Sequence, residues 1–214
     1  MGALNLYALH LEFISQDFKI DILRRVLEAF SDLIVEVESS ITEASGCDEY
    51  IEAVVDEETA VIEDLLGCGF VACQSYIAAV VSGVRSLHKR AKADEHQLCT
   101  TNETKDSIMR FRGNTVAGGN YTEIQVINAF ANYFKHHEGW PRQWGNATGP
   151  AAETIAVIQA VGAIQASTGN LRTGSESLGN KEYKHLGAFA DKLSEWLARL
   201  CSEYRRELQN IGLL

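Results

Sequence analysis

The scarcity of proline constrains the fold of this chain more than any other feature. Its 214 residues include only two prolines, Pro141 and Pro150, so the first 140 residues contain no strong helix breaker. Apolar residues recur there every three or four positions, as on the buried face of an amphipathic helix. The first series comprises Leu23, Val26, Leu27, Phe30, Leu33, Ile34, Val37 and Ile41. A second series extends over residues 50–87, and together they predict long helices over residues 17–44 and 48–92, paired antiparallel.

Shorter helices are predicted in the rest of the chain. They begin near Tyr121, at Pro150 and before Leu186. Residues 94–120 and 167–180 are polar or glycine-rich and predict loops, with one short helix in the first. No segment shows the two-residue alternation of a half-buried strand. The sequence therefore predicts an all-α helical bundle with two long antiparallel helices and about three further helices.

Charge is distributed unevenly along the chain. Nineteen Lys and Arg residues oppose 29 Asp and Glu residues, and the net charge of −10 does not favour a general polyanion binder. Thirteen of the carboxylates lie between Val26 and Val84, where Lys, Arg and His are absent. The long helices are therefore expected to present an acidic outer face. That face is either a solvated surface or a docking surface for a basic partner.

Several features together predict a cytoplasmic protein. The first seven residues contain no basic segment of a secretory signal. Charged residues and Gln are expected to interrupt the apolar stretches before the ~18 residues of a membrane span, so we expect no membrane association. The cysteines are scattered without metal-binding spacing, which is typical of free thiols. They are Cys47, Cys68, Cys73, Cys99 and Cys201.

The sequence lacks a complete set of residues for a metal or cofactor site. Di-metal helical bundles use two Glu-x-x-His pairs, whereas this chain contains one, Glu182 with His185. The glycine-rich segment 113–120 follows no predicted strand, so it does not match a phosphate-binding loop. We therefore expect no bound metal and no cofactor.

Basic residues gather at two places that are candidates for contacts with RNA phosphates. Arg85, Lys89 and Arg90 lie near the end of the second long helix, where cations also suit the helix dipole. Arg110 and Arg112 precede the glycine-rich segment. If the fold brings both groups to one side, they form an anion-binding patch.

The predicted helix after Tyr121 carries a polar strip. The strip begins at Asn128. Asn132, Lys135 and His136 follow four, seven and eight positions later, and this spacing places all four residues on one helix face. Histidine is the residue type best suited to acid–base catalysis near neutral pH, so His136 is a candidate general acid or base. Lys135 is a candidate for stabilising phosphate charge. The alternative is that the strip forms interhelical hydrogen bonds within the bundle.

The segment 131–136, Ala-Asn-Tyr-Phe-Lys-His, resembles the signature of the HEPN superfamily in its Asn and its His. That signature is an Arg, often followed by a polar residue, and a His four to six residues later. The resemblance covers about residues 17–138 and implies a helical core there. The helices predicted over 150–211 complete a single domain, 1–214. The resemblance also implies a homodimer and a metal-independent ribonuclease site with His136 and Asn132 as catalytic residues. Ala131 stands where the family has Arg, which predicts weak or absent cleavage.

Three functions are therefore compatible with the sequence. The first is a HEPN-like protein that binds RNA or weakly cleaves it, in stress or phage defence. The second is a non-enzymatic interaction module whose acidic helices dock a basic protein. The third is a di-metal or nucleotide-processing helical enzyme, for which the sequence offers the fewest residues.

Overall fold

A computed structural model describes residues 5–15, 18–44, 51–116, 119–181 and 183–214 of the chain. Cys47 and Glu182, which entered the predictions above, lie outside these residues. The described part contains helices and no strand, which confirms the all-α prediction. Its β-type pairing is limited to one isolated bridge, between Thr115 and Thr122.

Eight α-helices follow one another along the described residues. They are α1 (Leu6–Ile14), α2 (Phe18–Ala44), α3 (Ile51–Ala93), α4 (Lys105–Arg110), α5 (Glu123–His136), α6 (Gly149–Ala160), α7 (Asn170–Ser177) and α8 (Gly187–Asn210). Short 3-10 turns cover His137–Gly139 and Trp144–Asn146. The two long predicted helices correspond to α2 and α3.

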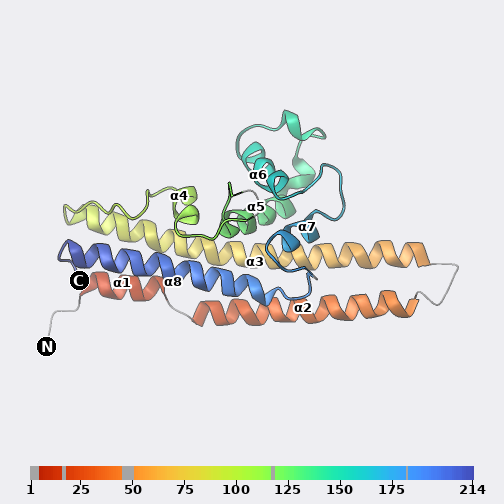
Figure 1. Cartoon of the computed structure of the whole chain (residues 1–214), viewed down its shortest axis with the longest axis horizontal. Coiled ribbons are helices and arrows are strands. Elements are labelled where there is room, and N and C mark those ends of the chain that lie inside the picture. Colours follow the sequence, from red (N-terminus) through yellow and green to blue (C-terminus); the bar gives the residue numbers. More distant parts are fainter. Residues whose placement is uncertain (1–4, 16–17, 45–50, 117–118, 182) are drawn as a thin grey trace.

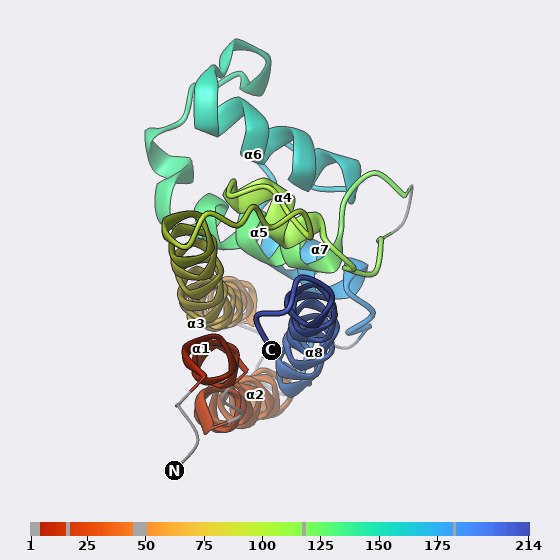
Figure 2. The same ribbon diagram turned by 90° about the vertical axis from the view of Figure 1, so that its left-hand side faces the viewer.

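Helix α3 is the central element of the fold. Helices α1 and α2 follow one another along it, and α8 lies beside all three (Figure 1). Viewed from the end, α1, α2, α3 and α8 form one bundle, and α4, α5 and α6 cover it on the side away from α2 (Figure 2). The helices α3, α5 and α8 meet where the ring of Phe70 stacks on Phe130 and Phe189, at centroid distances of 5.4 and 5.1 Å.

Two glycines allow the close approach of α5 to its neighbours. A Cβ atom on Gly67 of α3 would lie 2.1 Å from the Phe134 ring, and one on Gly174 of α7 would lie 2.6 Å from the Phe130 ring. Gly67 weakens α3 as an isolated helix, because glycine costs about 1 kcal/mol relative to alanine. Here it provides the space into which α5 packs.

Two helices were not predicted from the sequence. Helix α1 is apolar on both sides, so it shows no single buried stripe. Helix α7 lies in the segment predicted as a loop. Its first turn is stabilised by Glu63 of α3, whose carboxylate accepts the backbone N–H groups of Leu171 and Arg172 at 2.9 and 3.1 Å. These two donors have no partner within their own helix, so a distant carboxylate caps α7.

The expectation that every apolar stretch is too short for a membrane span is wrong for one helix. The segment Val55–Ala93 of α3 is long and apolar enough to cross a membrane by composition alone. No charged residue occurs between Asp64 and Arg85. More than half of that apolar window is buried inside the protein, as in the core helix of a bundle.

Candidate functional site

The polar strip of α5 packs against a buried glutamine of α3. The Gln74 side chain is 9% exposed. Its nitrogen donates to Asn128 Oδ1 at 2.9 Å, to the Asn128 carbonyl at 3.2 Å and to Asn132 Oδ1 at 2.8 Å. Its oxygen accepts a hydrogen bond from Lys135 Nζ. Three of the four strip residues that the sequence placed together therefore share one partner.

Two further cations extend this network. Lys105, the first residue of α4, donates from Nζ to Asn128 Oδ1 at 2.6 Å. Arg85 of α3 also lies nearby, and its positive charge and that of Lys135 lower the pKa of Lys105. The Arg85 Nε donates to the Glu103 carbonyl at 2.8 Å. We call Arg85, Lys105 and Lys135 the cation cluster.

The cation cluster has no carboxylate partner in the part of the chain that the structure describes. Among the described residues, none of its three members forms an ion pair. Burial lowers the pKa of Lys105, and the positive charges of Lys135 and Arg85 lower it further. The Asn128 and Asn132 oxygens are occupied by donors, so their amide nitrogens remain as donors. The site therefore combines positive charge and hydrogen-bond donors, as an anion site requires.

His136 lies apart from this network. Its side chain is exposed, and it forms no hydrogen bond or ion pair with a described residue. Ala131, at the position of the HEPN arginine, is 0% exposed within the core. Position 131 is therefore packed in the core, although it lies within one helical turn of Asn128 and Lys135.

The other basic residues predicted to bind RNA do not join the cation cluster. Arg110 pairs with Asp106 at 3.0 Å, and Arg112 pairs with Glu203 at 3.0 Å. Lys89 is exposed.

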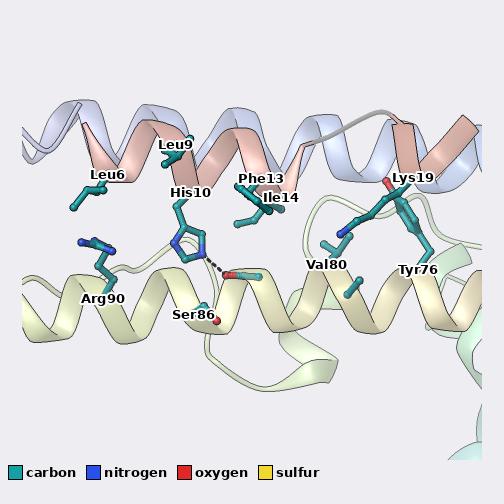
Figure 3. Close-up of a pocket in the computed structure, with 12 residues that line it drawn as sticks. Leu6, Leu9, His10, Phe13, Ile14, Lys19, Tyr76, Val80, Ser86 and Arg90 are labelled. Carbon is teal, nitrogen blue, oxygen red and sulfur yellow. Dashed lines mark hydrogen bonds between the residues drawn. The ribbon is translucent and has the colours of Figure 1, made fainter. Parts of the chain in front are cut away.

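Arg90 lies at a cavity of about 360 Å³ between α1 and α3 (Figure 3). Its guanidinium stands 5.8 Å from the centre of the Tyr7 ring. Apolar residues of α1, such as Leu6 and Phe13, line the same cavity, where His10 Nε2 lies 3.2 Å from the Gly83 carbonyl oxygen. Of the five predicted RNA contacts, only Arg85 lies in the cation cluster.

Gln74 and Lys105 carry the site but were not predicted as site residues. Gln74 is an uncharged residue within an apolar series, where the sequence gives no sign that it faces α5. Lys105 reaches the site because α4 packs against both α3 and α5. Within the described ranges there is also no group of three or more His, Cys, Asp or Glu side chains that could hold a metal ion.

No protein-family model, curated protein or solved structure matches this chain.

Proposed function

We propose that this chain is a HEPN-like RNA-binding protein that holds RNA phosphates at the cation cluster and cleaves RNA weakly or not at all. The observation that carries the proposal is the gathering of Arg85, Lys105 and Lys135, with no carboxylate partner among the described residues, in a chain of net charge −10. Burial and the positive charges of Lys135 and Arg85 all lower the pKa of Lys105, so an anion bound beside it would stabilise its charged form.

The geometry favours binding over cleavage. The family's arginine is replaced by Ala131, and this position is buried. Lys135 supplies a positive charge one residue before His136, but its Nζ is engaged by Gln74. Residual cleavage would depend on His136, whose exposed ring is accessible to a ribose hydroxyl as general base.

Fluorescence anisotropy with a labelled single-stranded RNA tests the proposal. We expect Lys105→Gln and Lys135→Gln each to weaken binding several-fold and to reduce the salt slope by about 0.7 for each phosphate that the variant no longer neutralises. Arg206→Gln is the matched control, because it removes one positive charge from α8, where Arg206 pairs with Glu203. Equal weakening by all three variants would mean that only net charge matters, and the site assignment would then be wrong.

A second candidate function is an interaction module that docks a basic protein. It is favoured by the acidic α2–α3 surface, where Asp32, Glu36 and Asp56 are exposed. Replacing Asp32 and Glu36 with Asn and Gln should abolish such docking while leaving RNA binding unchanged. A pull-down with the paired wild-type and variant proteins separates the two functions.

The same proposal includes a cytoplasmic homodimer in which α2 and α3 form the antiparallel pair of the family. It is supported by large apolar side chains left exposed on α1 and α2, of which Phe13 and Ile22 are 61% and 59% exposed. Sedimentation analysis at micromolar concentration tests it, with Phe13→Glu expected to shift the protein to a monomer. A wild-type monomer would exclude the dimer.

A further inference from the structure

A larger cavity lies on a different face of α5 from the cation cluster. Its volume of about 760 Å³ is in the range of small-molecule sites. Its walls are α3, the end of α5 with the following turn, and the segments 140–144 and 165–171. We call it the aromatic groove, after the rings of Tyr133, Trp140 and Trp144 that line it.

The three rings are arranged edge to face. The Tyr133 centroid lies 5.7 Å from that of Trp140 and 6.3 Å from that of Trp144, and the two tryptophans are 6.3 Å apart. The His137 ring stacks on Tyr133 at 4.7 Å. Aromatic faces carry partial negative charge and attract cations. Tyr133 and Trp144 are buried and Trp140 is partly exposed, so Trp140 provides most of this surface.

Hydrogen bonds hold this surface in place. The Tyr133 hydroxyl accepts from Asn170 Nδ2 at 3.1 Å. The Trp144 backbone N–H donates to Gln165 Oε1 at 2.9 Å, and Gln165 Nε2 donates to the Arg142 carbonyl at 2.6 Å. The rings are therefore positioned before any ligand binds, which lowers the entropic cost of binding.

Carboxylates are distributed along the groove. Asp56, Glu63, Asp64 and Glu138 line it, against a single guanidinium, Arg142. Asp56, Asp64 and Glu138 are exposed and form no ion pair with a described residue.

Two of these carboxylates are separated along one helix. Asp56 and Asp64 are eight residues apart on α3 and both line the groove, with a rise of about 12 Å between them. The negative charge is therefore spread along the groove beside the aromatic surface.

We infer that the aromatic groove binds a linear aliphatic polyamine. Its ammonium groups would meet the separated carboxylates at Asp56, Asp64 and Glu138, and its methylene segments would lie on the partly exposed ring of Trp140. A compact cation fits less well, because it reaches one carboxylate and leaves the others unpaired. A metal ion is not favoured either, because the described carboxylates do not cluster as ligands.

Isothermal titration calorimetry with spermidine at fixed ionic strength tests this inference. We expect saturable binding of one spermidine per chain, and at least tenfold weaker binding of 1,3-diaminopropane, which is too short to bridge the carboxylates. Asp56→Asn and Glu138→Gln should each weaken spermidine binding at least fivefold. Both residues are exposed, so the fold should tolerate these changes. Trp140→Leu should weaken binding further.

Asp32→Asn is the control, because it removes an equally exposed carboxylate from α2, outside the groove. It should leave the affinity for spermidine unchanged. Equal weakening by Asp32→Asn, or equal affinity for the short diamine, would show general charge attraction and overturn the inference. Binding of a lysine-rich peptide without binding of spermidine would also overturn it, in favour of protein docking.

Discussion

Gln74 of α3 donates a hydrogen bond to Asn132 of α5 at 2.8 Å, from a position that is 9% exposed. This bond fixes the register of the two helices, because Asn132 is one turn from Asn128, which the same amide nitrogen contacts. It also decides how the polar strip is oriented. The amide oxygens face α3, so the strip offers donors to a ligand.

Replacing Gln74 with leucine should lower the free energy of unfolding by about 1–3 kcal/mol. The change removes the shared partner of Asn128, Asn132 and Lys135 from a buried position. Urea denaturation of the variant measures the decrease. Ser75→Ala is the control, since Ser75 is exposed and bonds only to the Val71 carbonyl of its own helix. A decrease below about 0.5 kcal/mol for Gln74→Leu would show that the network contributes little.

Introducing the family's arginine by Ala131→Arg should destabilise the protein by more than about 3 kcal/mol. Position 131 is 0% exposed, so the longer side chain overpacks the core and buries an unpaired charge. Thermal denaturation followed by circular dichroism measures the effect. A folded variant with increased RNA cleavage would contradict this prediction and restore the ribonuclease interpretation.

His136→Ala should change the free energy of unfolding by less than about 0.5 kcal/mol, because His136 is exposed and has no polar partner in the described structure. His88→Ala is the contrasting variant. His88 is 6% exposed, and its Nε2 lies 2.7 Å from the Tyr204 hydroxyl, so its removal should cost about 1–3 kcal/mol. If the wild-type protein cleaves RNA, His136→Ala should remove that activity without lowering the melting temperature.

Stability should decrease as the pH falls below about 6.5, the ordinary pKa of histidine. Burial lowers the pKa of His88, although Glu103 and Glu207 act in the opposite direction. The unfolded chain therefore binds a proton at this residue more readily than the folded chain does. Neutral His88 therefore contributes fully to the free energy of unfolding above pH 6.5. This contribution is lost as the pH falls toward the lowered pKa of His88 in the folded protein.

Urea denaturation of wild type and His88→Gln over pH 5–7.5 isolates this contribution. The glutamine variant does not titrate, so its free energy of unfolding should fall less steeply with decreasing pH. Parallel pH profiles for the two proteins would show that His88 is not responsible.

Thiol labelling of the native protein should distinguish two classes of cysteine. Cys68 and Cys99 are exposed and should react, although burial and Asp64 raise the pKa of Cys68. Cys73 and Cys201 are buried, and burial raises the pKa of Cys201 to about 11, so both should react only after unfolding. Peptide mapping by mass spectrometry identifies the labelled positions. Rapid labelling of Cys73 would contradict the packing of α3.

The sequence predicted part of the candidate site. Helical spacing placed Asn128, Asn132 and Lys135 on one face, because side chains on a helix follow a fixed period. The same spacing included His136, which the fold leaves exposed at the edge of the strip. Spacing within a helix gives the relative directions of its side chains, but not which residues of a neighbouring helix they contact.

Some features of the fold depend on contacts between residues far apart in the sequence, which local sequence patterns do not predict. Helix α7 has a loop-like sequence and is capped by Glu63, more than one hundred positions earlier. Gly67, a weak point of α3 in isolation, is required by the Phe134 ring.

The sequence by itself determined the all-α class and the extent of α2 and α3. Those features follow from the near absence of proline and from apolar residues at helical period, and both act between neighbours in the chain. Only the tertiary structure decided that Gln74, Lys105 and Lys135 share one site and that Ala131 faces the core. The reason is physical: the direction and partner of a polar side chain depend on which helices pack together, and packing is set by the whole core.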